Sequence, residues 1–123
     1  MKESGEMYLE TIYFLSDGGK NPVKSVDVAN KLGISRPSVN HAVSVLKQLG
    51  YIRQEAYGDI TVTEAGLQYA AQVVYKHRTI TDFLVRSLNL PADTAEADAC
   101  RIEHVVSNDT IERMAEYVRR HGG

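Results

Sequence analysis

Residues 25–62 hold the pattern that most restricts the fold of this chain. A segment after Ser25 has apolar residues at helical spacing and ends at Gly33, a residue type that readily closes a helix. A second helical segment follows Ser35, a good N-terminal cap, carries Pro37 in its first turn and runs to Leu49. Two short runs of β-forming residues then flank a turn at residues 56–59. This order predicts a winged helix-turn-helix.

The second helix of such a motif enters the major groove of DNA, so its exposed face is the candidate recognition surface. On that face, Arg36 can donate to guanine or phosphate and Asn40 can pair with adenine. Tyr57, at the tip of the hairpin, is expected to lie against the adjacent DNA backbone. The candidate DNA-binding residues are Ser35, Arg36, Pro37, Ser38, Asn40, His41 and Tyr57. The alternative is a solvated helix beside a surface hairpin in an unrelated helical domain.

The other apolar-periodic segments predict four more helices, at about residues 5–16, 64–88, 93–106 and 107–122. Thr63 is expected to cap the second of these, and Asp93 to begin an acidic capping box for the third. The helix at 64–88 is longer than so small a core needs, so part of its apolar face is expected to meet a partner subunit. The predicted fold class is mainly α with one small β-hairpin.

Charge is unevenly distributed along the 123 residues, although the formal net charge is only -2. Residues 20–78 carry eight basic and four acidic side chains, whereas the segments on either side are acidic. A basic middle suits contact with phosphate, and solvated surface charge would also explain it. No apolar run approaches the roughly 18 residues of a membrane span. With no signal-peptide pattern and a single cysteine, the sequence predicts a cytoplasmic protein without internal disulfides or membrane association.

The predicted helix at 93–106 carries a set of residue types that bind divalent metals. Cys100, Glu103 and His104 are spaced i, i+3 and i+4, which places them on one helical face, with Glu96 one turn earlier. Nucleophilic catalysis by Cys100 with His104 is disfavoured, because neither an oxyanion donor nor an orienting third group is evident. The sequence therefore does not predict an enzyme.

Three more candidate ligands come from other predicted helices. Met7 and Glu10 lie one turn apart in the first helix, and His77 lies in the helix at 64–88. In the structural alternative, Met7 belongs to the core, Cys100 is a small buried hydrophobe, and the charged groups are solvated or ion-paired.

Four stretches of the chain resemble the diphtheria toxin repressor and manganese transport regulator family. They are EMYLETIY at 6–13, the segment 35–47, KHR at 76–78 and EADACRIEHVVS at 96–107. The resemblance implies a metal-activated transcriptional repressor of metal-uptake genes that binds, as a homodimer, a double-stranded operator with an inverted repeat. It also implies a winged helix-turn-helix domain at residues 1–63 and a helical metal-binding and dimerisation domain at 64–123.

The resemblance assigns ligands from two branches of that family. Met7, Cys100, Glu103 and His104 match the primary site of the iron-responsive branch. Glu10 and His77 match ligands of the manganese branch, which has aspartate and glutamate at the positions of Met7 and Cys100. His77 also matches the ancillary site of the iron branch, but the other positions of that site are Thr81 and Glu96 here.

Thioether and thiolate ligands favour Fe(II) over Mn(II), so Fe(II) is the expected cofactor and Mn(II) the alternative. Co(II), Ni(II) and Zn(II) are expected to bind in vitro. Two other functions stay open: a winged-helix regulator with a vestigial metal site, and a small metal-binding or thiol protein that does not bind DNA.

Overall fold

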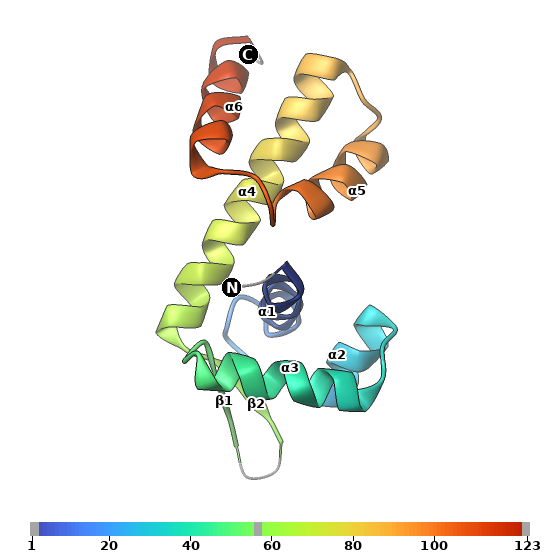
Figure 1. Ribbon diagram of the computed structural model, residues 1–123, viewed down its shortest axis with the longest axis vertical. Helices are drawn as coiled ribbons and strands as arrows, with labels where there is room; N and C mark the ends of the chain where they lie inside the picture. The colour runs from blue at the N-terminus through green and yellow to red at the C-terminus, as the bar shows by residue number, and fades with distance from the viewer. Residues whose placement is uncertain (1–2, 56–57, 122–123) are drawn as a thin grey trace. The chain divides into compact units, whose positions relative to one another are not determined.

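The computed structural model describes residues 3–55 and 58–121, which form six helices and one two-stranded antiparallel sheet (Figure 1). This confirms the predicted fold class. The elements are α1 (Glu3–Leu15), α2 (Ser25–Leu32), α3 (Arg36–Gln48), β1 (Ile52–Gln54), β2 (Ile60–Val62), α4 (Glu64–Leu88), α5 (Ala92–Ile102) and α6 (Asn108–His121). The chain divides into two compact units, Met1–Ala71 and Gln72–Gly123, and the boundary in the sequence falls inside α4. The boundary between residues 63 and 64 that the sequence suggests stays a prediction.

The helix-turn-helix forms for the local reasons visible in the sequence. Gly33 closes α2 with φ +66°, a left-handed conformation that glycine adopts without strain. Ser35 caps α3, because its Oγ accepts a hydrogen bond from the backbone N–H of Ser38 at 3.3 Å. Pro37 lies in the first turn of α3, where its missing N–H is tolerated. The two helices and their turn therefore follow the predicted order.

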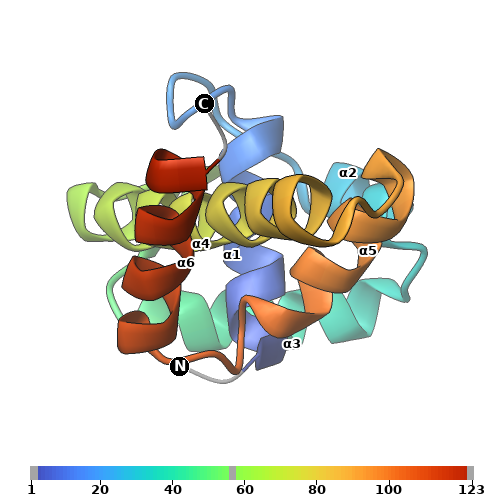
Figure 2. The same cartoon turned by 90° about the horizontal axis from the view of Figure 1, so that it is seen from above.

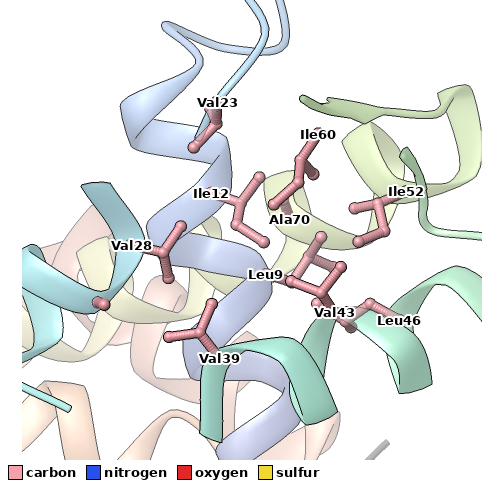
Figure 3. Close-up of a cluster of buried hydrophobic side chains, with 11 residues drawn as sticks. Leu9, Ile12, Val23, Val28, Val39, Val43, Leu46, Ile52, Ile60 and Ala70 are labelled. Carbon is pink, nitrogen blue, oxygen red and sulfur yellow. The ribbon is translucent and has the colours of Figure 1, made fainter. Parts of the chain in front are cut away.

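The core of the first unit gathers around α1, whose Leu9 and Ile12 have no exposed surface. Figure 3 shows these two side chains between those of α2 and α3 and those of the sheet and α4. The surrounding side chains are Val23, Val28, Val39, Val43, Leu46, Ile52, Ile60 and Ala70. Burial of this apolar set is the main stabilising contribution to the unit.

The hairpin is short and closely joined to the rest of the first unit. Ile52 pairs with Val62 and Gln54 with Ile60, and Ile60 also forms a bridge with Val23. Thr63 caps α4 as predicted, because its Oγ1 accepts a hydrogen bond from the N–H of Gly66 at 3.1 Å. The same hydroxyl donates to the carbonyl of Gly50 at 2.6 Å, which connects α4 to the end of α3.

In the second unit, α5 and α6 flank the C-terminal part of α4 on opposite sides (Figures 1 and 2). The buried side chains shared by the three helices are Ile80, Leu84, Ala95, Ala99 and Ile111. Ser107 caps α6 by accepting a hydrogen bond from the N–H of Thr110 at 3.2 Å. No helix in the described part of the chain combines the length and apolar character needed to span a membrane.

Two predictions about α5 are wrong. The residue that caps it is Pro91, with extended ψ of 145°, and the carboxylate of Asp93 instead accepts a hydrogen bond from the adjacent N–H of Thr94. The helix also ends at Ile102 instead of Val106. The N–H groups of Val105 and Val106 both bond to the carbonyl of Ile102, so the chain leaves the helix through a tightened turn.

Candidate functional site

Glu103 is the centre of a polar cluster inside the second unit. It follows α5 directly, keeps helical dihedral angles and donates its N–H to the carbonyl of Ala99 at 2.9 Å. Its side chain is inside the unit and has no exposed surface. Nδ1 of His77, from α4, lies 2.8 Å from Glu103 Oε2, and Nε2 of His104 lies 3.3 Å from Oε1. A buried carboxylate thus has an imidazole nitrogen at each of its two oxygens.

The buried carboxylate of Glu103 needs polar or charged partners. A carboxylate without exposed surface is costly to ionise unless it is paired or hydrogen-bonded. His104 is itself nearly buried, with 5% of its side chain exposed, while His77 is 27% exposed. A divalent cation could be bound by the same carboxylate and imidazole groups. Across residues 3–55 and 58–121, however, no group of three or more His, Cys, Asp and Glu side chains is already arranged as a metal site.

Cys100 lies in α5, one turn before Glu103, and is exposed. Because α5 ends at Ile102, Glu103 and His104 lie in the turn after it and not within the longer helix that the sequence predicted. The structure brings His77, Glu103 and His104 together. Cys100 belongs to the same segment but is not buried with Glu103. The interpretation of Cys100 as a small buried hydrophobe is therefore wrong.

In the first unit, Met7 and Glu10 lie in α1, one turn apart. The Met7 side chain is 36% exposed and is not part of the buried core. The alternative interpretation of Met7 as a core residue is therefore wrong. Oε2 of Glu10 is buried and has no hydrogen-bond partner within the part of the chain that the structure describes. A buried polar atom without a partner is costly, and a bound cation is one way to satisfy it.

The candidate DNA-binding residues lie at the N-terminal end of α3. Arg36, Asn40 and His41 are exposed, as a recognition surface requires. The hydroxyl of Ser35 donates to that of Ser38 at 2.9 Å as well as capping the helix, so these two serines already have local partners. Pro37 is also exposed in the first turn. Tyr57 lies outside the described residues.

Glu6 and Tyr69 form a further contact that no sequence pattern indicates. The Tyr69 hydroxyl donates to Glu6 Oε2 at 2.5 Å, and Glu6 is 9% exposed. Burial raises the pKa of the Tyr69 hydroxyl well above its ordinary value of 10.0, and the hydrogen bond to Glu6 and its charge raise it further. The two residues are 63 positions apart, so no local spacing could have indicated their contact.

Two family models match consecutive parts of the chain. The iron dependent repressor N-terminal DNA binding domain matches residues 1–60. The iron dependent repressor metal binding and dimerisation domain matches residues 63–121.

An uncharacterized HTH-type transcriptional regulator of Methanocaldococcus jannaschii is 37% identical over 98% of this chain and 96% of its own length. The iron-dependent repressor IdeR of Mycobacterium tuberculosis is 37% identical over 91% of this chain and 48% of its own length. Among solved structures, the manganese regulator SloR is 30% identical, with a TM-score of 0.80 over 94% of this chain and 53% of its own. The chain thus spans about half the length of the latter two proteins.

These matches cover both units and agree with the helix-turn-helix and with the six-helix fold. They also confirm the resemblance found in the sequence, since the matched domains are those of DNA-binding repressors and not of enzymes. The chain therefore belongs to the iron-dependent repressor family of metal-dependent transcriptional regulators.

Proposed function

We propose that this chain is a sequence-specific DNA-binding repressor of metal-uptake genes that is activated by Fe(II) and acts as a homodimer. The observation that carries the proposal is the fully buried Glu103 carboxylate with His77 and His104 at its two oxygens. Such a regulator needs a DNA-binding helix and a metal site. The helix-turn-helix of the first unit offers the former, and the Glu103 cluster of the second unit offers ligands for the latter. Membership of the family supports the same function.

The proposed ligands are Met7, Glu10, His77, Cys100, Glu103 and His104. Imidazole, carboxylate, thiolate and thioether groups together form a suitable donor set for a divalent transition metal. The ion would supply positive charge to the buried Glu103. With metal bound, the two recognition helices of a homodimer would match successive major grooves of an inverted repeat.

Fe(II) is proposed because Met7 and Cys100 supply sulfur, which suits iron better than manganese. Both side chains are exposed, so neither is committed to a hydrophobic core. Mn(II) is the second candidate, and a specific observation favours it: Glu10 adds a hard carboxylate ligand whose Oε2 has no hydrogen-bond partner among the described residues. SloR, to which this chain is similar, is a manganese regulator.

Metal choice is tested by anaerobic equilibrium dialysis of reduced, metal-free protein against Fe(II) and, separately, Mn(II), with bound metal counted by elemental analysis. Saturation at lower free Fe(II) than Mn(II) supports an iron sensor. The reverse order supports a manganese sensor. No saturable binding of either ion overturns the proposal.

DNA binding is tested by selection from a pool of random-sequence duplexes, in parallel with metal-loaded and chelated protein. The proposal predicts that an inverted repeat is enriched only with metal. Enrichment of the same sequence by chelated protein would indicate a vestigial metal site, and no enrichment would indicate a protein without a DNA role.

A further inference from the structure

The hydrogen bond between Tyr69 and Glu6 connects two helices of the first unit. Tyr69 lies in α4 and Glu6 in α1, and the donor–acceptor distance is 2.5 Å. A phenol that donates to a carboxylate forms a charge-assisted bond, which is shorter and more directional than a neutral one. Because Glu6 is 9% exposed, little water competes for its carboxylate.

The ring of Tyr69 contacts a second tyrosine. Its centroid lies 5.0 Å from that of Tyr51, and the ring planes are inclined by 54°. Tyr51 follows α3 and precedes β1, and its N–H donates to the carbonyl of Leu46, in α3, at 3.1 Å. One side chain thus contacts α1 through its hydroxyl and, through its ring, the segment that joins the recognition helix to the hairpin.

The position of Glu6 gives this arrangement a consequence for the proposed ligands in α1. Glu6 immediately precedes Met7, and Glu10 is four residues later, so Glu6 and Glu10 lie on the same face of the helix. A directional bond to the Glu6 carboxylate restricts rotation of α1 about its own axis. Together with the burial of Leu9 and Ile12, this bond sets the direction in which Glu10 and Met7 leave the helix.

We propose that Tyr69 is a positioning residue that couples metal binding by Met7 and Glu10 to the orientation of the recognition helix α3. This inference rests on the proposed function. An apolar side chain could fill the same space and keep the ring contact with Tyr51, but it could not hold the Glu6 carboxylate in one direction. Tyr69 therefore acts through its neighbours and is not itself a ligand or a DNA-contacting residue.

The quantity that reports this role is the ratio of DNA affinities with saturating metal and without metal. For Tyr69→Phe, this ratio is expected to fall roughly threefold to tenfold relative to wild type. By thermodynamic reciprocity, the gain in metal affinity caused by DNA must fall by the same factor. A merely structural role would lower the melting temperature but leave the ratio unchanged in the folded protein.

The experiment measures both ratios with Fe(II) or Mn(II) and with the duplex that metal-loaded wild-type protein selects. Glu6→Leu should match Tyr69→Phe, and the double variant should be no worse than either, because both changes remove the same bond. Glu6→Gln keeps an oxygen acceptor for the phenol and should restore most of the coupling. Tyr75→Phe, on the same helix with a 45% exposed side chain, is the matched control.

Failure of the inference and failure of the proposed function give different results. If wild-type DNA binding ignores metal, the proposed function fails and the inference with it. If wild type responds and Tyr69→Phe has the same ratio, only the inference fails. Should Tyr69→Phe not fold, the ratios of Glu6→Leu and Glu6→Gln decide: equal values for these two variants would contradict the coupling role, and loss only in Glu6→Leu would support it.

Discussion

Nδ1 of His77 lies 2.8 Å from Oε2 of Glu103, a carboxylate without exposed surface, so α4 and the turn after α5 meet at a charged group inside the second unit. His104 lies 3.3 Å from the other carboxylate oxygen. Replacing a whole buried ion pair by well-packed hydrophobic side chains of similar volume often costs a protein no stability. The burial of Glu103 between two imidazoles is therefore weak evidence that this cluster serves stability alone.

Glu103→Gln is expected to weaken Fe(II) and Mn(II) binding at least roughly tenfold, since changing even the partners of metal ligands typically costs 10–100-fold. Glutamine preserves the size of the side chain and removes its charge. Equilibrium dialysis measures the affinity, and Glu112→Gln, an exposed position in α6, is the control. Unchanged metal affinity in Glu103→Gln would show that the buried carboxylate is not a ligand.

Arg36→Ala is expected to weaken DNA binding and to reduce the slope of log affinity against log salt by about one, because one phosphate or base contact is lost. Metal affinity should not change. Fluorescence anisotropy at several salt concentrations gives the slope. Arg113→Ala removes an equally charged, exposed side chain from α6 and should leave the slope unaltered; an equal effect of both variants would argue against a specific role for Arg36.

Gly66→Ala is expected to lower the free energy of unfolding by about 2–4 kcal/mol, because a Cβ there overlaps the carbonyl oxygen of Tyr51 and comes within 2.8 Å of Val62. At Gly33, with φ +66°, the added Cβ meets nothing within 4 Å. Gly33→Ala should therefore cost only about 1–2 kcal/mol, from the left-handed backbone alone. Chemical denaturation compares the two, and a Gly66→Ala cost below that of Gly33→Ala would contradict the close approach of α4 to Tyr51.

Stability should also depend on Tyr69 at alkaline pH. Its pKa is raised by burial and by Glu6, so the folded state retains the phenolic proton after the unfolded state has lost it. The contribution is fully present below pH 10 and is lost as pH rises above the unfolded pKa of 10.0. The unfolding free energy of wild type should thus fall more steeply above pH 10 than that of Tyr69→Phe. Identical slopes for wild type and Tyr69→Phe would show that Tyr69 titrates normally.

Features that depend on local chemistry were predictable from the sequence. Gly33, Ser35 and Thr63 each determine a turn or a cap through their own backbone or hydroxyl, and the structure confirms all three. The end of α5 was not predictable in this way. Val105 and Val106 continue the apolar spacing of the helix, whereas the backbone leaves it at Ile102 through bonds to a single carbonyl.

The candidate site was also predictable only in part. Residue types and spacing led to His77, Glu103 and His104, and the structure places these three together. Spacing alone could not show that Glu103 is fully buried while Cys100 is exposed, because this depends on where α5 ends and on how it packs against α4. The contact of Tyr69 with Glu6 depends on tertiary packing over 63 residues.

The most direct test of metal-activated DNA binding is an anaerobic titration of the wild-type protein with Fe(II) at constant salt, with the affinity for the selected duplex measured at each free-metal concentration. The proposed function predicts that affinity rises at least about tenfold, which is within the usual range of allosteric coupling, and then saturates. It also predicts that a chelator reverses the rise. Equal affinity in chelator and in saturating Fe(II), with Mn(II) equally without effect, would contradict it.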